Sequence, residues 1–232
     1  MKTYVFGDSY SVEFNNPNLF PPGHEYCDWK GYVPKKYFHL LSEKFGSTEI
    51  INYAMSGNDN DNIFEKFTEV YKNIEQDDLV IFGWTILNRF SICNNLKKNQ
   101  PDEYLWGSST GFNEFDWVVS AALNKSTKLY YNRIHKLINF INNILVTNKV
   151  VHWTWKYEPG NEMLDEKTIK YETNGDVNDF HYNENTHLIL YNKMIKEFEN
   201  NNKISVDLWS EHLFQHQNTS IMMDYKIKRS LI

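Results

Sequence analysis

Long apolar segments are absent from this sequence. No run of hydrophobic residues approaches the ~20 that an α-helix needs to cross a bilayer. The basic start, apolar stretch and cleavage site of a signal peptide are also missing, because Met1 to Phe6 already has the composition of a first strand. We therefore expect a soluble, cytoplasmic protein with no membrane span.

Cysteine and excess positive charge are also scarce. Cys27 and Cys93 are too few for a disulfide framework and lack the spacing of a metal site, so we expect reduced thiols. The 24 Lys and Arg residues are outnumbered by 30 Asp and Glu, which gives a net charge of −6 with no basic stripe. Because binding to a phosphate backbone needs such a stripe, nucleic acid is not an expected partner.

The chain has enough apolar residues for one domain with a sizeable core, at 232 residues and a hydrophobic fraction of 41%. Strand-like runs alternate with helical patterns in which apolar residues recur at three and four. This alternation predicts a single α/β domain over 1–232, in which crossover helices join the strands of a central parallel sheet. The expected strands are Lys2–Phe6, Glu49–Tyr53, Leu79–Trp84 and Lys149–Trp155, and the expected helices are Lys35–Phe45, Ile63–Ile74 and a segment from about Phe115 to Val146.

Three long segments show neither the strand period nor the helix period. They are rich in Asn, Pro, Gly and aromatic residues, and they cover Asn15–Lys30, Asn94–Asn113 and Tyr157–Asn178. Loops of this length inside a compact domain are in most cases functional or disordered. We expect these three to form the walls of one cleft.

The first strand ends at Gly7-Asp8-Ser9. Ligands of parallel α/β sheets bind at the carboxyl ends of the strands, and Ser9 is predicted to lie at such an end. A serine in this place can be the N-cap of the next helix or a nucleophile, and the three residues alone favour the cap.

Further polar residues follow other predicted strand ends or precede a predicted helix. Each has an ordinary structural explanation, such as Asn58 or Asp59 capping a helix. Together the segments supply Ser, Gly, Asn and His in that order, which favours a catalytic site over four separate caps. The residues concerned are Gly57 in 51–59 (INYAMSGND), Thr85 and Asn88 in 78–90 (DLVIFGWTILNRF), and Asp179 and His181 ahead of the amphipathic segment to Met194.

The order and context of these residues resemble the SGNH hydrolases, also called GDSL esterases. The resemblance covers the chain to about residue 200. The matching positions are Gly7, Asp8 and Ser9 in the first block, Asn52 and Gly57 in the second, and His181, Asn183 and His187 in the last, where Tyr182 and Thr186 replace the usual proline and glycine.

Two positions depart from the family pattern. Its third block is G-x-N-D, but Thr85 stands where the asparagine belongs, and Asn88 lies three residues further on. The position of the acid, three residues before His181, is occupied by Asn178, whereas Asp179 is two before it. Either Asp179 orients the histidine, or a Ser–His pair works with a backbone carbonyl.

The resemblance implies a flavodoxin-like, three-layer α/β/α sandwich and a serine esterase without metal or cofactor. A histidine base would take the proton of Ser9, and a carboxylate would fix the imidazole tautomer. His181 and Asp179 are the implied base and acid. The implied oxyanion hole is formed by the N–H groups of Ser9 and Gly57 with a side-chain donor, for which chemistry favours Asn88 and chain position favours Thr85. We expect Asn88 to donate, with Thr85 supporting it.

The expected substrate is an acyl ester, preferably acetyl, on a small molecule or a carbohydrate. Aromatic rings around the cleft can stack on sugar faces, so Trp84 is predicted to bind substrate together with Asp8. The other rings considered are Trp106, Trp153 and Trp155, and packing in the core is at least as good an explanation for the last two. The alternative function is an inactive SGNH-fold binding or structural module.

Three further motifs are weaker. Ser109 lies in a G-x-S-x-G sequence, but a polar, loop-like segment precedes it instead of the strand that a nucleophile elbow requires. His212 and His216 share the spacing of a helix face without a third metal ligand. The Asn58–Asp61 run lacks the spacing and distal glutamate of a calcium loop.

Overall fold

The computed structural model describes residues 1–18, 21–85, 89–93, 104–108, 133–154, 181–198 and 203–205. Strands and helices alternate over most of this part of the chain. The elements are β1 (Thr3–Gly7), α1 (Pro21–Lys30), α2 (Tyr37–Lys44), β2 (Ile50–Asn52), α3 (Asn60–Val70), the 3₁₀ turn η1 (Tyr71–Asn73), β3 (Leu79–Trp84), β4 (Arg89–Cys93), β5 (Tyr104–Ser108), β6 (Lys149–Thr154), α6 (Glu184–Phe198) and β7 (Lys203–Ser205), and residues 133–144 are also helical.

Five strands form one parallel sheet in the order β2-β1-β3-β6-β7. Strands β1 and β3 are buried at every residue, and β6 at every residue after Lys149. Continuous burial is typical of parallel strands with both faces covered. The prediction of an α/β fold around a central parallel sheet is therefore confirmed, and each of the four expected strands lies within two residues of its predicted bounds.

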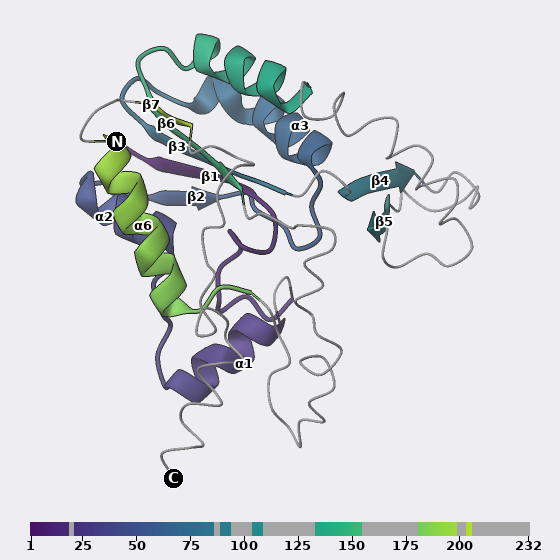
Figure 1. Cartoon of the computed structure of the whole chain (residues 1–232), viewed down its shortest axis with the longest axis vertical. Coiled ribbons are helices and arrows are strands. Elements are labelled where there is room, and N and C mark those ends of the chain that lie inside the picture. Colours follow the sequence, from purple (N-terminus) through teal and green to yellow (C-terminus); the bar gives the residue numbers. More distant parts are fainter. Residues whose placement is uncertain are drawn as a thin grey trace.

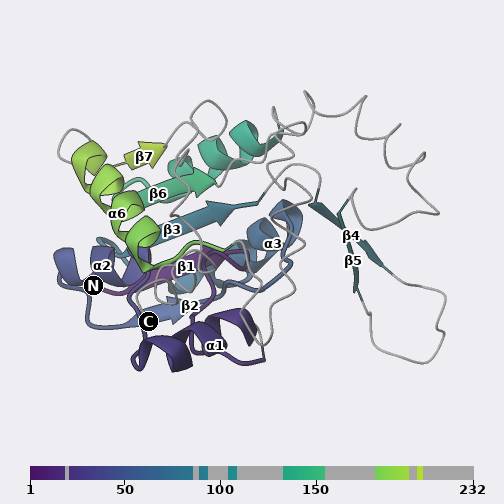
Figure 2. The same cartoon turned by 60° about the horizontal axis from the view of Figure 1, so that its bottom comes forward.

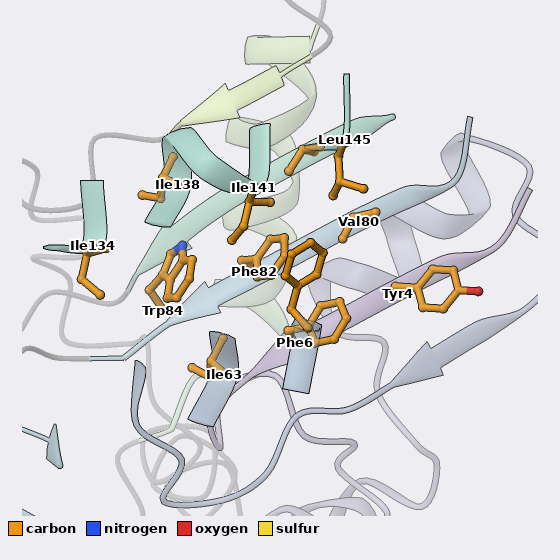
Figure 3. Packing of buried hydrophobic residues seen from close by; sticks show 12 residues of the cluster. Tyr4, Phe6, Ile63, Val80, Phe82, Trp84, Ile134, Ile138, Ile141 and Leu145 are labelled. Carbon is orange, nitrogen blue, oxygen red and sulfur yellow. The ribbon is translucent and has the colours of Figure 1, made fainter. Parts of the chain in front are cut away.

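Side chains of alternate strand residues enter two separate hydrophobic clusters, as the two-residue period of a strand requires. One face, with Phe6, Phe82 and Trp84, packs against α3 and the helix 133–144 (Figure 3). The other face, with Val5, Ile81 and Trp153, packs against α2 and α6. Figures 1 and 2 show these two pairs of helices on opposite sides of the sheet. No helix in the described part of the chain is long and apolar enough to span a membrane.

Two of the segments predicted to be loops contain regular structure. Residues 21–30 form α1, whose Tyr26 and Cys27 pack with Val12 and Phe14 from the chain after β1. Residues 104–108 form β5, which pairs antiparallel with β4 in a ribbon that stands apart from the parallel sheet (Figures 1 and 2). The loop prediction is wrong at both places, because α1 has no clear apolar period and the apolar run in β5 is too short to predict a strand. The third segment, 157–178, lies outside the described residues.

Two paired glycines allow the chain to fold back at the end of the sheet. Gly7 of β1 is in register with Gly83 of β3. A Cβ on Gly7 would lie 2.7 Å from the Oγ atom of Ser11, and one on Gly83 would lie 2.5 Å from the same atom. The Ser11 hydroxyl shares a hydrogen bond of 2.8 Å with the Tyr37 hydroxyl, which accepts another of 2.9 Å from Trp153 Nε1. Ser11 thus occupies space that only glycines leave open.

His187, in the first turn of α6, is fully buried. Its ring centroid lies 5.5 Å from that of Phe14, 5.8 Å from that of Tyr37 and 5.9 Å from that of Tyr182. Neither ring nitrogen has a hydrogen-bond partner in the part of the chain that the structure describes. Burial, followed by the nearby charge of Lys36, lowers the pKa of His187 well below its ordinary value. His187 is therefore neutral in the folded protein at pH 7.

We expect Gly83→Ala to destabilise the fold by about 1–3 kcal/mol, because the new methyl group meets Ser11 and the Trp153 ring in a packed site. Ser11→Ala removes the nearest of these atoms. In urea unfolding, the Gly83→Ala/Ser11→Ala double variant should lose less stability than the sum of the two single variants. Strict additivity would show that the Gly83 methyl group does not compete with Ser11 for space.

Buried, neutral His187 should contribute to acid destabilisation. Below about pH 6.5 the histidine is protonated in the unfolded chain but not in the folded protein. The free energy of unfolding therefore decreases as the pH is lowered, by up to about 1.4 kcal/mol per pH unit. His187→Phe removes this titration and keeps an apolar ring. Urea unfolding should therefore show the variant gaining stability relative to the wild type between pH 7 and pH 5. An unchanged difference between the two proteins would contradict the buried, neutral state.

Candidate active site

Ser9 lies in a tight turn at the carboxyl end of β1. The Asp8 carbonyl accepts from the Ser11 N–H at 2.9 Å, and Asp8 Oδ1 accepts from the Tyr10 N–H at 3.1 Å. The next helix, α1, begins at Pro21, so Ser9 does not cap a helix. Asp8 is buried and holds the turn that presents Ser9, and its expected role in substrate binding stays a prediction.

The Ser9 and His181 side chains meet directly. His181 Nε2 lies 2.6 Å from Ser9 Oγ, although the two residues are 172 positions apart in the sequence. The expectation that they lie within hydrogen-bond reach is confirmed. Just after His181, Asn183 caps α6, because its Oδ1 accepts from the N–H and the hydroxyl of Thr186, both at 2.9 Å. This cap fixes the residue at which α6 begins. It therefore also fixes the position of His181, which lies just before the helix.

Helix α1 and the residues after it hold the start of α6. Lys30 Nζ lies 3.1 Å from Glu184 Oε2, and the Tyr32 hydroxyl donates to the same oxygen at 2.7 Å. The Glu184 N–H donates to the Tyr26 hydroxyl at 3.3 Å. A segment predicted to be a loop is therefore a helix that helps to place His181. The sequence pattern gave no sign of this role.

Gly57 lies in the loop between β2 and α3, which is bound to the end of β1. The Gly7 carbonyl accepts from the Met55 N–H at 3.1 Å and from Asn58 Nδ2 at 3.2 Å. Gly57 has a φ of 78°, in the left-handed region that favours glycine. In the described residues, neither the Ser9 N–H nor the Gly57 N–H has an acceptor. Two backbone donors are thus available on loops that start from neighbouring strands.

Asn52 joins the end of β2 to the turn that carries Ser9. Its Nδ2 donates to the Ser11 carbonyl at 2.9 Å, and its Oδ1 accepts from the Ala54 N–H at 2.9 Å. The asparagine of the second block is therefore a structural residue that orders two loops at once.

Asn60 holds the backbone of Thr85 from both sides. Its Oδ1 accepts from the Thr85 N–H at 2.9 Å, and its Nδ2 donates to the Thr85 carbonyl at 3.0 Å. The Thr85 hydroxyl is buried and has no hydrogen-bond partner in the described part of the chain. Gly7 and Gly83 are in register on adjacent parallel strands, and Ser9 and Thr85 each lie two residues beyond them. The two residues therefore occupy equivalent positions after neighbouring strand ends. This role of Asn60 has no signal in the sequence, since an asparagine next to a helix start is typical of a helix cap.

The Asn58–Asp61 run at the start of α3 has structural roles. Asp59 is the N-cap of α3 and accepts from the Asn62 N–H at 2.8 Å, which confirms one of the two predicted caps. Asp61 forms an ion pair of 2.9 Å with Arg133. Asn58 and Asn60 bind the backbones of β1 and of the residue after β3, as described above. These contacts join the start of α3 to the ends of β1 and β3 and to the helix 133–144.

The predicted substrate-binding role of Trp84 is wrong. Its side chain is fully buried in the cluster between the sheet and the helix 133–144, with no face open to a sugar (Figure 3). Its indole N–H donates to His152 Nδ1 at 3.1 Å. Trp153 is equally buried, as the core-packing explanation requires. Successive side chains of a strand point to opposite faces of the sheet, and Trp84 lies on the face that α3 and the helix 133–144 cover.

Several predicted residues lie outside the described part of the chain. They are the acid Asp179, the possible oxyanion donor Asn88, the aromatic residue Trp155 and the weaker candidates Ser109, His212 and His216. Only the backbone of β5 is described around Trp106. A strand does precede Ser109, contrary to expectation, but it belongs to the β4–β5 ribbon and not to the parallel sheet.

The geometry places a serine hydroxyl, a histidine ring and backbone N–H donors together at the carboxyl ends of neighbouring parallel strands. The chain matches no protein-family model, and neither the curated proteins nor the solved structures contain a match to it.

Proposed function

We propose that this chain is a serine esterase of the SGNH type, which removes a small acyl group through an acyl-enzyme on Ser9. The contact of 2.6 Å between Ser9 Oγ and His181 Nε2 is the observation that supports it most strongly. Helices on both sides of the parallel sheet and the strand order β2-β1-β3 agree with the three-layer, flavodoxin-like fold of that family. In this strand order the ligand crevice is expected where β1 and β3 end.

The proposed reaction has two steps. His181 accepts the proton of the Ser9 hydroxyl while Ser9 Oγ attacks the ester carbonyl carbon, and His181 then protonates the departing alcohol. In the second step His181 takes a proton from water, which attacks the acyl-enzyme and releases the acid with regeneration of Ser9. We propose Asp179 as the carboxylate that fixes the imidazole tautomer, on the basis of its position two residues before the histidine.

The proposed oxyanion hole consists of two backbone donors and one side chain. The N–H groups of Ser9 and Gly57 are available for the developing negative charge. We assign the third donor to the Thr85 hydroxyl, because it is buried without a partner and the Asn60 amide already satisfies the Thr85 backbone. A threonine hydroxyl engaged with its own backbone could not donate, so the Asn60 contacts matter for this assignment.

The proposed substrate is an acetyl or similarly short acyl ester. A carbohydrate carrier remains a prediction from Trp106 and Trp155 alone, because buried Trp84 no longer supports it. The alternative is a binding module with this fold and no turnover, and the replacement of the third-block asparagine by Thr85 is the feature that favours it.

Hydrolysis of p-nitrophenyl acetate by the full chain should require both members of the Ser9–His181 pair. Ser9→Ala and His181→Ala should each lower kcat/KM by about 10³-fold or more, because the nucleophile and its base act as a unit. Ser109→Ala is the matched control, and it should keep wild-type activity. If Ser109→Ala alone abolishes turnover, the nucleophile is misassigned. A folded wild-type protein with no turnover on any short acyl ester would support the binding module.

The third oxyanion donor can be tested by isosteric substitution. Thr85→Val keeps the shape of the side chain and removes the hydroxyl, so it should lower kcat by at least about 10-fold, or ~1.4 kcal/mol of transition-state stabilisation. Thr85→Ser keeps the donor and should stay within about threefold of the wild type. A large effect of Asn88→Ala together with none of Thr85→Val would assign the donor to Asn88 instead.

A further inference from the structure

The Tyr10 side chain lies against the ring of His181. Their ring centroids are 4.7 Å apart, with 43° between the ring planes. Tyr10 is 8% exposed and belongs to the hydrophobic cluster below the nucleophile turn. The residue that follows the nucleophile thus contacts the histidine that bonds to the nucleophile.

Both the backbone and the ring of Tyr10 are fixed from several directions. Its N–H donates to Asp8 Oδ1 at 3.1 Å, and its carbonyl accepts from the buried Lys36 Nζ at 3.3 Å. The ring packs edge-to-face on Tyr182, at 4.7 Å between centroids. Since Tyr182 directly follows His181, the same aromatic ring supports two consecutive residues of that segment. Tyr10 therefore has a defined position beneath the imidazole.

We propose that Tyr10 is a positioning residue for His181, which holds the imidazole towards Ser9 and stabilises the imidazolium that forms during ester hydrolysis. A cation within about 6 Å of an aromatic centroid is attracted by the negative face of the ring. The imidazole carries a positive charge only after it has taken the Ser9 proton, so the attraction is stronger in the transition state than in the resting enzyme. This inference rests on the proposed function of Ser9 and His181.

In the part of the chain that the structure describes, other titratable groups lie around the contact between Tyr10 and His181. Asp8 lies in the nucleophile turn, Lys36 precedes α2 and contacts the Tyr10 carbonyl, and His187 lies in α6, where its pKa is lowered by burial. Tyr182 also packs on Tyr10, and burial raises its pKa, while the proposed acid Asp179 lies two residues before His181 in the sequence. A change confined to the Tyr10 ring leaves these groups in place. Its effect on His181 can therefore be measured separately from theirs.

A series of phenylalanines at position 10 tests the electrostatic part of the proposal. Tyr10→Phe keeps the ring and should stay within about twofold of wild-type kcat/KM. Incorporation of mono-, di- and trifluorophenylalanine at position 10 withdraws charge from the ring face with little change in shape. The acid limb of the pH profile of kcat/KM should then move stepwise to lower pH. Tyr10→Leu, which has no ring, should move it furthest, by about 0.4–1.5 pH units, with a fall of about 2- to 30-fold in the plateau rate.

A second measurement does not depend on turnover. NMR signals of the His181 ring, assigned with His181→Gln, should change with pH at a midpoint that falls along the same series. If the midpoint falls while no ester is hydrolysed, the attraction between the Tyr10 ring and the His181 imidazolium is confirmed and the proposed esterase function fails. An unchanged midpoint and acid limb across the fluorinated series would overturn the inference, even if activity is high. The fluorinated variants keep this test valid if Tyr10→Leu does not fold.

Discussion

The close approach of Gly7 and Gly83 is the constraint on which the site depends. The two glycines are in register on adjacent parallel strands, and their missing side chains leave the space that Ser11 occupies. The chain can therefore turn back directly after β1, with Ser11 bonded to Tyr37 below and Ser9 left at the edge of the sheet. A larger residue at either glycine would push this turn away from the sheet, and the Ser9 hydroxyl with it.

Asparagine side chains extend that constraint to the neighbouring loops. Asn52 binds the Ser11 carbonyl, Asn58 binds the Gly7 carbonyl, and Asn60 binds both backbone groups of Thr85. An amide has donors and an acceptor on one short side chain, so each can replace strand pairing where the ladder ends. The ends of β1, β2 and β3 are thus joined by side chains from a single segment of nine residues, 52–60. The rigidity of the proposed oxyanion hole follows from these contacts.

Sequence patterns predicted the strands and helices whose burial leaves a regular apolar period. They did not predict features that depend on contacts between segments far apart in the sequence. The buried strands were found because parallel strands covered on both faces read as continuous apolar runs. Helix α1 was missed because its partners, Val12 and Phe14 among them, lie outside the helix. The Ser9–His181 pair followed from motif order, whereas Tyr10 and Asn60 act through tertiary contacts that have no sequence period. The role of Trp84 was wrongly predicted, because the pattern of a strand does not show whether an aromatic side chain is buried in the core or exposed to a ligand.

Covalent labelling by a fluorophosphonate tests most directly whether Ser9 is an activated nucleophile. The reagent phosphonylates a serine whose hydroxyl is activated by a base, and peptide mass spectrometry locates the adduct. We expect one adduct per chain, on Ser9, and none in the same time on His181→Ala, in which the base that contacts Ser9 at 2.6 Å is gone. A folded wild-type chain that acquires no adduct on Ser9, or acquires it on another serine, would contradict the proposed mechanism.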